Sequence, residues 1–247
     1  MITAVVLAKN AAASLSNCLD SLKWCDSVLV IDDNSIDDTA KIAKRHGAQI
    51  LTQNLNGDFA AQRNRAMEQV TDGWILFVDA DEVVPVDLAN EIRSALSRDF
   101  KAYHLHRQDI FMGQPLRHGE TSTWNDIRLA KSGVGQWVGQ VHETWDIHGS
   151  VGQLTTPLIH HGHSNIGSFL AKINTYSTLA AAEFFHAGKR SSAWQIILYP
   201  AAKFVQNYIF RLGFLDGTHG FVHAMCMSFH SFLVRSKLYL LAKHSHA

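Results

Sequence analysis

The sequence lacks the features that mark several common classes of protein. Only three of its 247 residues are cysteines, and Cys18, Cys25 and Cys226 have neither metal-ligand spacing nor a CxxC pair. Such a sparse, odd-numbered set argues against a disulfide scaffold and favours a reducing compartment. No run of eighteen uncharged apolar residues occurs, so the pattern predicts no simple membrane-spanning helix. The N-terminal stretch has no basic start and is too short for a secretion signal, so we interpret it as a strand.

The glycine-rich loops that bind phosphates are missing as well. No G-x-G-x-x-G and no G-K-[ST] follows any predicted strand, which disfavours dinucleotide-binding and P-loop chemistry. A nucleotide bound by this chain would therefore need a metal ion to neutralise its phosphates. The composition, 47% hydrophobic and 18% charged, is that of a globular protein without low-complexity segments or evident repeats.

Charge is unevenly distributed although the formal net charge is zero. Residues 1–150 hold 14 Lys and Arg against 20 Asp and Glu, whereas residues 151–247 hold 8 against 2, together with 9 of the 15 histidines. This asymmetry indicates either that the C-terminal part faces an anionic membrane or nucleic acid, or that it is a helical extension packed on an acidic domain. Its basic residues are interleaved with apolar runs rather than clustered, which favours lipid headgroups and argues against nucleic acid.

Alternating strand and helix patterns predict an α/β fold with a mostly parallel, Rossmann-like sheet. Strands are expected over residues 2–8, 28–31, 48–51 and 74–78, with helices between them. The second helix is expected to begin at Asn34 or Ser35 as N-cap and to end at Gly47. We further expect a helix after Pro85, a half-exposed strand over 101–107, a loop-heavy region over 110–150 and a strand over 157–159.

From Ser168 onward the pattern is helical. We therefore predict a catalytic domain over residues 1–165 and a helical C-terminal extension over 166–247. In the extension Lys203, Asn207 and Arg211 recur every fourth residue on an apolar, aromatic stretch. A basic stripe of this kind is typical of an interface helix, here one that contacts a membrane surface.

The strand Trp74–Val78 carries the most informative polar residues. Its continuous apolar run predicts a strand buried on both faces, and Asp79 and Asp81 fall at its carboxyl end, where ligands of open α/β sheets bind. Residues two apart in an extended chain point the same way. Two converging carboxylates favour Mg²⁺ or Mn²⁺, although such acids are also common as solvated turn residues or helix caps.

Four motifs, in this order, resemble the family 2 glycosyltransferases with the GT-A fold: Val5–Asn10, Ile31–Ser35, Gln62–Asn64 and Phe77–Glu82. Five later motifs resemble the bacterial branch that builds the lipopolysaccharide core, in which a β-glucosyl or similar residue is added to the inner core. They are Asp126–Leu129, Val141–Glu143, Pro157–His160, Ile173–Ser177 and Gly213–Gly217. The resemblance covers nearly the whole chain.

The resemblance implies a role for individual residues. The donor, a UDP-sugar, would be bound by Ala8, Asn10, Asp32, Asp33, Gln62, Asn64 and Asp79. Mg²⁺ or Mn²⁺ would be held by Asp79, Asp81 and His160, and Glu143 would be the catalytic base. Relatives often show His-Tyr-x-Tyr where this chain has His160–His163, so the choice among His160, His161 and His163 as metal ligand stays open.

The implied activity is the inverting transfer of a hexose to a hydroxyl of a lipopolysaccharide core or similar envelope glycolipid. The enzyme would work as a peripheral protein on the cytoplasmic face of the inner membrane, with its anionic surface as partner. A divalent cation would stabilise the charge that develops on the departing diphosphate. The acceptor hydroxyl is a poor nucleophile and needs a base within hydrogen-bonding reach. The residues do not identify the sugar or the acceptor.

Two other functions fit parts of the pattern. A phosphatase of the haloacid dehalogenase type would use Asp79 as nucleophile and Asp81 as general acid, but no acidic pair follows Glu82 to complete its magnesium site. The second alternative is a non-catalytic protein, which would use the same sheet to bind a nucleotide-sugar or a membrane but would not turn over a sugar donor. Glu143 also has a structural alternative, an ion pair with Arg128.

Overall fold

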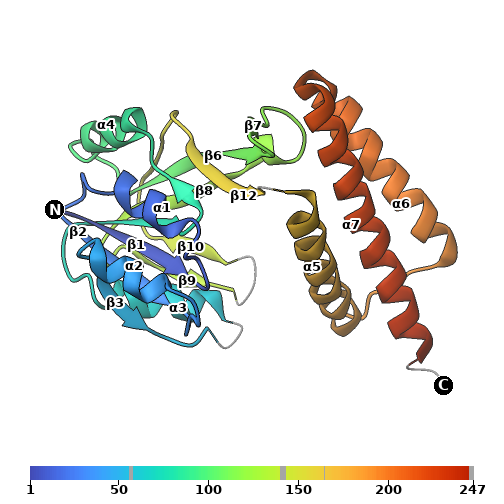
Figure 1. Ribbon diagram of the computed structural model, residues 1–247, viewed down its shortest axis with the longest axis horizontal. Coiled ribbons are helices and arrows are strands. Elements are labelled where there is room, and N and C mark those ends of the chain that lie inside the picture. Colours follow the sequence, from blue (N-terminus) through green and yellow to red (C-terminus); the bar gives the residue numbers. More distant parts are fainter. Residues whose placement is uncertain (56–57, 140–142, 164, 245–247) are drawn as a thin grey trace. The chain divides into compact units, whose positions relative to one another are not determined.

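The computed structural model describes residues 1–55, 58–139, 143–163 and 165–244 (Figure 1). The chain divides into two compact units. The first comprises Met1–Arg107 and Trp124–His160, and the second comprises Gln108–Thr123 and His161–Ala247. The second unit thus adds a short segment to the expected helical extension, and the functional boundary after residue 165 stays a prediction.

The first unit is a mixed sheet with helices on both faces. Its elements are β1 (Ile2–Ala8), α1 (Leu15–Ser21), β2 (Ser27–Asp32), α2 (Thr39–Arg45), β3 (Gln49–Thr52), α3 (Phe59–Met67), β4 (Trp74–Asp79), β5 (Glu82–Val83), α4 (Val86–Ala95), β6 (Ala102–Phe111), β8 (Asn125–Lys131), β9 (Gly135–Val138), β10 (Thr144–Ile147), β11 (Val151–Gln153) and β12 (Leu158–His163). Strands β6 and β12 continue into the second unit.

Over the residues that are described, the strand order is β3-β2-β1-β4-β8-β6-β12-β5. Strand β1 pairs in parallel with β2 and β4, and β2 pairs in parallel with β3. Strand β8 runs antiparallel to both of its neighbours, β4 and β6. The predicted α/β fold with a parallel sheet is therefore confirmed for β3, β2, β1 and β4, which are neighbours in the sheet. These are also the four strands expected in this part of the sequence.

The apolar run of β4 is buried because both faces of the sheet are covered. On one face Leu76 and Val78 pack with α1, α2 and α4, and on the other Phe77 packs with α3 and the β9–β10 hairpin. Each fully buried side chain of this size stabilises the fold by about 1.5–3 kcal/mol. The sheet therefore gives a rigid base for the polar loops that follow its strands.

Two local expectations are wrong. Asn34 and Ser35 do not cap α2: Asp38 occupies its N-cap, and the Ser35 hydroxyl instead accepts a hydrogen bond from the Asn10 amide at 2.8 Å. The region 110–150 holds more strand than expected, because β9 and β10 pair as a hairpin. This hairpin requires glycine at Gly135, where a Cβ atom would clash with the backbone carbonyl of Asp146.

The second unit consists mainly of helices. It contains β7 (Gln114–Pro115), η1 (Thr121–Thr123), α5 (Ile166–His186), α6 (Ala193–Val205), the π-turn η2 (Gln206–Phe210), η3 (Gly213–Asp216) and α7 (Gly217–His244). Helices α5 and α6 each pack along α7. The Lys237 ammonium of α7 donates to the Asn174 carbonyl of α5 at 2.7 Å, which links these two helices. Within the described ranges, none of the helices combines the length and apolarity needed to span a bilayer.

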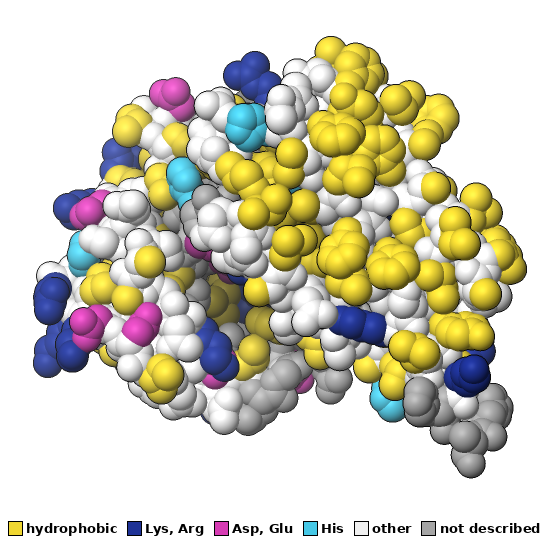
Figure 2. Space-filling model, turned by 45° about the vertical axis from the view of Figure 1, so that its right-hand side comes forward, with side chains coloured by type: hydrophobic (Ala, Val, Ile, Leu, Met, Phe, Trp, Pro, Cys, Tyr) yellow, Lys and Arg dark blue, Asp and Glu magenta, His cyan; other side chains and the backbone are white. Residues whose placement is uncertain are grey.

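Two residues of the predicted basic stripe, Lys203 in α6 and Asn207 in η2, bind a neighbouring segment of the second unit. The Lys203 ammonium binds Glu120 at 2.9 Å, and the side-chain amide of Asn207, 1% exposed, donates to the same carboxylate at 3.3 Å. The prediction that this stripe contacts a membrane is therefore wrong for the buried Asn207, whereas Lys203, with a side chain that is 26% exposed, is paired with an acid from a segment distant in sequence. Apolar and aromatic side chains are exposed instead, and Figure 2 shows them gathered over the helices of this unit.

Candidate functional site

The loops that follow β1 and β2 interlock at the carboxyl edge of the sheet. The β1–β2 register places Ala8 beside Asp32. Asn10, in the left-handed region with φ of 48°, accepts a hydrogen bond from the Ile36 amide on its side-chain oxygen at 2.9 Å. Three of the residues expected to bind the donor, Ala8, Asn10 and Asp32, thus lie on adjacent strand ends.

The two carboxylates that end β2 organise these loops. Asp32 and Asp33 are each only 4% exposed. Asp33 binds the Lys9 ammonium at 2.7 Å and accepts from the Leu55 amide at 2.9 Å. Asp32 accepts from the Ser35 amide at 3.2 Å. Both acids therefore shape the edge of the sheet at the place where a nucleoside is expected.

The polar residues of α3 bind neighbouring backbone. The Gln62 side-chain amide donates to the Gln53 carbonyl at 3.4 Å. Asn64 makes a double hydrogen bond with the backbone of Trp137, donating at 2.9 Å and accepting at 2.8 Å. Asn64 thus fixes β9, and with it the β9–β10 hairpin, against α3. Its expected contact with the donor stays a prediction.

A chain of alternating charges connects the end of β4 to Glu143. Arg63 binds the Glu143 Oε1 atom through Nε at 3.0 Å and Nη2 at 2.9 Å, and its Nη2 lies 3.7 Å from Asp79 Oδ1. Arg128 Nη2 lies 3.3 Å from the other Asp79 oxygen. The Arg63 guanidinium also lies beside two rings, 4.7 Å from the Trp137 centroid and 5.4 Å from that of Phe77. Asp79 and Glu143 are therefore joined through one buried guanidinium.

Burial and charge set the protonation of this network. Burial opposes ionisation of Asp79, but Arg128 and Arg63 outweigh it and hold the pKa of Asp79 well below its usual range. Burial, followed by the charge of Asp79, raises the pKa of Glu82. One Glu82 oxygen accepts a hydrogen bond from the Asp79 amide at 2.8 Å. The network thus favours an ionised Asp79 and disfavours a second charge on Glu82.

Asp81 and His160 lie together, as expected of shared metal ligands. The antiparallel pairing of β5 with β12 places His160 opposite Glu82, and this brings its Nε2 atom to 3.4 Å from Asp81 Oδ2. The side chain of His160 is 12% exposed and that of Asp81 is 31% exposed. One carboxylate and one imidazole fit a divalent cation that takes its other ligands from substrate phosphates and water. In the part of the chain that the structure describes, no group of three or more His, Cys, Asp or Glu side chains converges on one point.

The remaining candidates are placed differently. His161 is exposed. Val141, His142 and the side chain of His163 lie outside the described residues. The alternative ion pair of Glu143 with Arg128 is wrong, because Glu143 binds Arg63 instead.

Three residues of the network were not among the expected site residues: Arg63, Arg128 and Glu82. Arg128 lies within a buried strand segment, where a charged side chain requires a partner. It also lies 5.1 Å from the Trp124 ring centroid. Arg63 is part of the Gln62–Asn64 motif. For Arg128 the available signal was a charge flanked by Ile127 and Leu129, and for Arg63 it was the motif itself, but the sequence did not indicate the partners of either.

Comparisons with known proteins give consistent results. Residues 3–147 match the family model described as Glycosyl transferase family 2. The lipopolysaccharide core biosynthesis glycosyltransferase LpsC of Rhizobium meliloti (strain 1021) is 27% identical over 96% of this chain and 92% of its own length. An uncharacterized glycosyltransferase of Rickettsia felis is also 27% identical, over 96% of this chain and 89% of its own length.

A solved structure shares the architecture. The mannosyltransferase PcManGT from Pyrobaculum calidifontis, determined in complex with GDP-Man and Mn²⁺, superimposes with a TM-score of 0.55 over 96% of this chain and 86% of that one. The two sequences are 14% identical, so this likeness concerns the fold. The expected GT-A fold with C-terminal helices is confirmed.

Proposed function

Since the chain belongs to glycosyl transferase family 2, we propose that it transfers a hexose from a UDP-sugar to a hydroxyl of a lipopolysaccharide-core or similar envelope glycolipid. The observation that carries this proposal is the contact of Asp81 with His160 at the end of β4, in the same unit as the Arg63–Glu143 pair. The similarity to LpsC supports the class of acceptor. A phosphatase of the dehalogenase type is set aside, because the family match covers the strand on which that alternative was based.

Asp81 and His160 would hold Mg²⁺ or Mn²⁺, and the cation when bound would stabilise negative charge on the departing diphosphate. Asp79 is engaged by Arg128 and Arg63. We propose that it keeps these guanidiniums in place beside the donor phosphates, in addition to its expected contact with ribose or metal. Asp32 and Asp33, which are buried at the neighbouring strand end, would bind the nucleoside together with Ala8 and Asn10.

Glu143 would remove the proton from the acceptor hydroxyl. Both hydrogen bonds that Arg63 donates go to one oxygen, Oε1, so the guanidinium would orient the carboxylate and leave Oε2 to the acceptor. This ion pair would fix the direction from which the carboxylate acts. A base opposite the leaving diphosphate enforces in-line displacement and inverts the anomeric centre.

Donor binding should stabilise the folded chain. We expect one UDP-sugar, in the presence of Mn²⁺, to raise the melting temperature of the full chain. At a hundredfold excess over Kd the stabilisation is about 2.7 kcal/mol. A thermal-shift screen of UDP-hexoses and UDP-hexosamines, each with and without Mn²⁺, measures it.

The matched variant in this screen is Asp81→Asn, which should lose the part of the shift that depends on Mn²⁺. If GDP- or ADP-sugars stabilise the chain and no UDP-sugar does, the proposed donor is wrong.

We also propose that the second unit binds the anionic cytoplasmic face of the inner membrane. Helix α6 and its π-turn expose Trp194, Ile197 and Phe210 at 59%, 77% and 78%, respectively. Tryptophan and other aromatic residues prefer the headgroup level of a bilayer. The excess of Lys and Arg after residue 150 would add electrostatic attraction. Peripheral binding therefore combines shallow apolar contact with charge.

Sedimentation with vesicles tests this attachment. We expect binding to anionic vesicles that falls as salt rises, since each basic residue near the surface contributes about 1 kcal/mol. Ile197→Ser should weaken binding by removing an exposed apolar contact. Ile36→Ser, which removes an isoleucine that is 94% exposed in the first unit, serves as the control. Binding to neither kind of vesicle would show that these helices serve packing only, and equal binding to anionic and neutral vesicles would contradict the proposed contribution of charge.

A further inference from the structure

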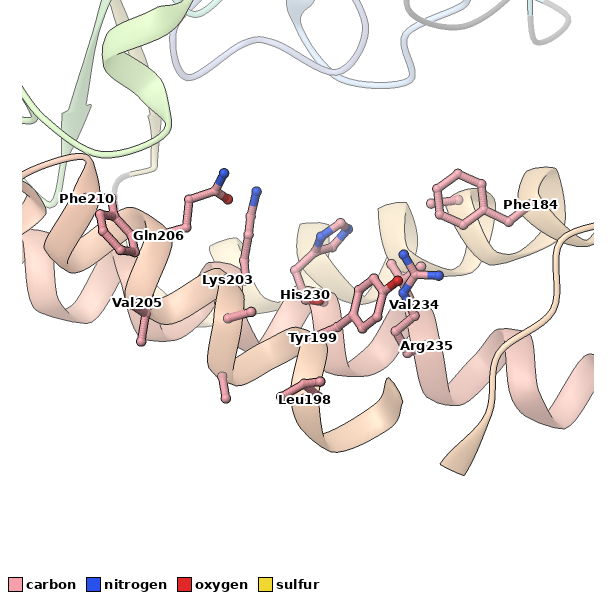
Figure 3. Close-up of a pocket in the computed structure, with 14 residues that line it drawn as sticks. Phe184, Leu198, Tyr199, Lys203, Val205, Gln206, Phe210, His230, Val234 and Arg235 are labelled. Atoms are coloured by element: carbon pink, nitrogen blue, oxygen red, sulfur yellow. The ribbon is translucent and has the colours of Figure 1, made fainter. Parts of the chain in front are cut away.

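The helices of the second unit form a groove that the proposed glycosyl transfer does not use. Helices α5 and α6 both pack on α7, and between them lies a groove of about 910 Å³ (Figure 3). Pockets of roughly 300–1,000 Å³ hold small organic ligands. All the residues that line it belong to the second unit.

The groove is lined mostly by apolar side chains. Small side chains come from α5 and α6, including Ala180, Ala201 and Ala202, and Val234 comes from α7. Because alanine and valine leave room close to the helix backbones, the lining suits an unbranched alkyl chain. Among the residues that the structure describes, those that line the groove include no aspartate or glutamate.

A row of polar side chains lies along one side of the groove. In Figure 3 the side chains of Gln206, Lys203, His230 and Arg235 point to the same side. The spacing of Tyr199, Lys203 and Gln206 along α6 and its π-turn places them on one helix face. The groove therefore combines an apolar lining with a polar margin, as an amphiphile requires.

Arg235 is the cation of this row that is not already paired with an acid. Lys203 is neutralised by Glu120 at 2.9 Å, and burial lowers the pKa of His230, which favours its neutral form. The Arg235 guanidinium lies 4.1 Å from the Tyr199 ring centroid and 5.6 Å from that of Phe184. Across the described ranges, no carboxylate forms a salt bridge with it.

We propose that this groove binds one molecule of an anionic phospholipid, with an acyl chain along the apolar lining and the phosphate on Arg235. Guanidinium groups bind phosphate through charge-assisted hydrogen bonds, and the flanking rings of Tyr199 and Phe184 already hold the guanidinium in position. A second copy of this chain fits less well. Its corresponding unit carries the same excess of Lys and Arg, so two such faces repel each other.

The inference goes beyond the proposed function, since it assigns a discrete lipid site rather than general membrane attachment. The test uses the full chain and isothermal titration calorimetry with monomeric dihexanoyl phosphatidylglycerol. We expect saturable binding with one lipid per chain, at least tenfold weaker binding of dihexanoyl phosphatidylcholine, and no binding of inorganic phosphate at the same concentration. No saturable binding of the phosphatidylglycerol would overturn the proposal.

Three variants locate the site. Arg235→Gln should weaken phosphatidylglycerol binding about tenfold, and Ala202→Trp, which fills the groove, should abolish it. Lys243→Gln removes an exposed cation of the same helix and should bind as the wild type does. Melting curves establish that the variants are folded. If Ala202→Trp does not fold, Ser231→Phe fills the groove from α7 instead.

Unchanged binding by a folded groove-filling variant would overturn the proposal, as would equal losses in Arg235→Gln and Lys243→Gln. Light scattering measures whether the chain is a monomer or a dimer in solution. A dimer of the wild type that Ala202→Trp converts to a monomer would show that the groove holds a second copy, which also contradicts a lipid site.

Discussion

Glu143→Gln is expected to lower kcat by about 10²- to 10⁴-fold, the usual contribution of a positioned base, while leaving the affinity for the UDP-sugar nearly unchanged. Glutamine keeps the shape of the side chain but cannot accept the proton of the acceptor hydroxyl. Affinity is preserved because a base that acts on the acceptor does not hold the nucleotide. Steady-state turnover and donor titration, measured on the same preparation, separate the two effects.

The ion pair with Arg63 requires a control for stability. Glu143→Gln leaves a buried guanidinium with Asp79 at 3.7 Å as its remaining acidic neighbour, so the melting temperature must be compared as well. Asp146→Asn removes an exposed carboxylate from the same hairpin and should keep wild-type kcat. If Glu143→Gln retains wild-type kcat, Glu143 is not the base, and Asp126 becomes the next candidate.

Excess chelator is expected to abolish transfer, and Mg²⁺ or Mn²⁺ to restore it. The strand ends provide no glycine-rich phosphate loop, so under the proposed function the negative charge of the departing diphosphate would be stabilised by a cation bound to Asp81 and His160. Asp81→Asn should behave like chelation even at ordinary metal concentrations, because a neutral amide oxygen is a weaker ligand for a hard cation. The measurement is initial rate against free metal concentration.

Asp87→Asn is the matched control for this second prediction. Asp87 is an exposed acid in the first turn of α4, six residues further along the chain, and its loss should leave the metal dependence unchanged. Undiminished transfer in excess chelator would eliminate the proposed role of the cation.

The sequence was sufficient to predict the parallel strands of the sheet and the position of the carboxylates at the end of β4. Residues 74–78 of β4 are all apolar because both faces of the sheet are covered there, and that pattern is visible in neighbouring residues alone. The position of Asp79 and Asp81 then follows from the rule that ligands bind beyond the carboxyl ends of parallel strands.

Long-range ion pairs could not be predicted in the same way. Arg63 and Glu143 are 80 positions apart, and their contact depends on how Asn64 fixes the β9–β10 hairpin against α3. The prediction for the basic stripe of Lys203 and Asn207 missed their partner for the same reason. Helical spacing correctly placed Lys203 and Asn207 on one face, but it did not indicate that Glu120 covers that face. Local periodicity determines which residues share a side, whereas the partner depends on tertiary packing.

The configuration of the product tests the central claim most directly. The full chain is incubated with the UDP-sugar found by thermal shift, Mn²⁺ and a lipopolysaccharide-core acceptor, and the anomeric protons of the product are observed by NMR. Inverting transfer from an α-linked donor predicts a β-linked sugar on the acceptor and one UDP released for each sugar transferred. An α-linked product, or release of UDP and free sugar without transfer to the acceptor, would contradict the account.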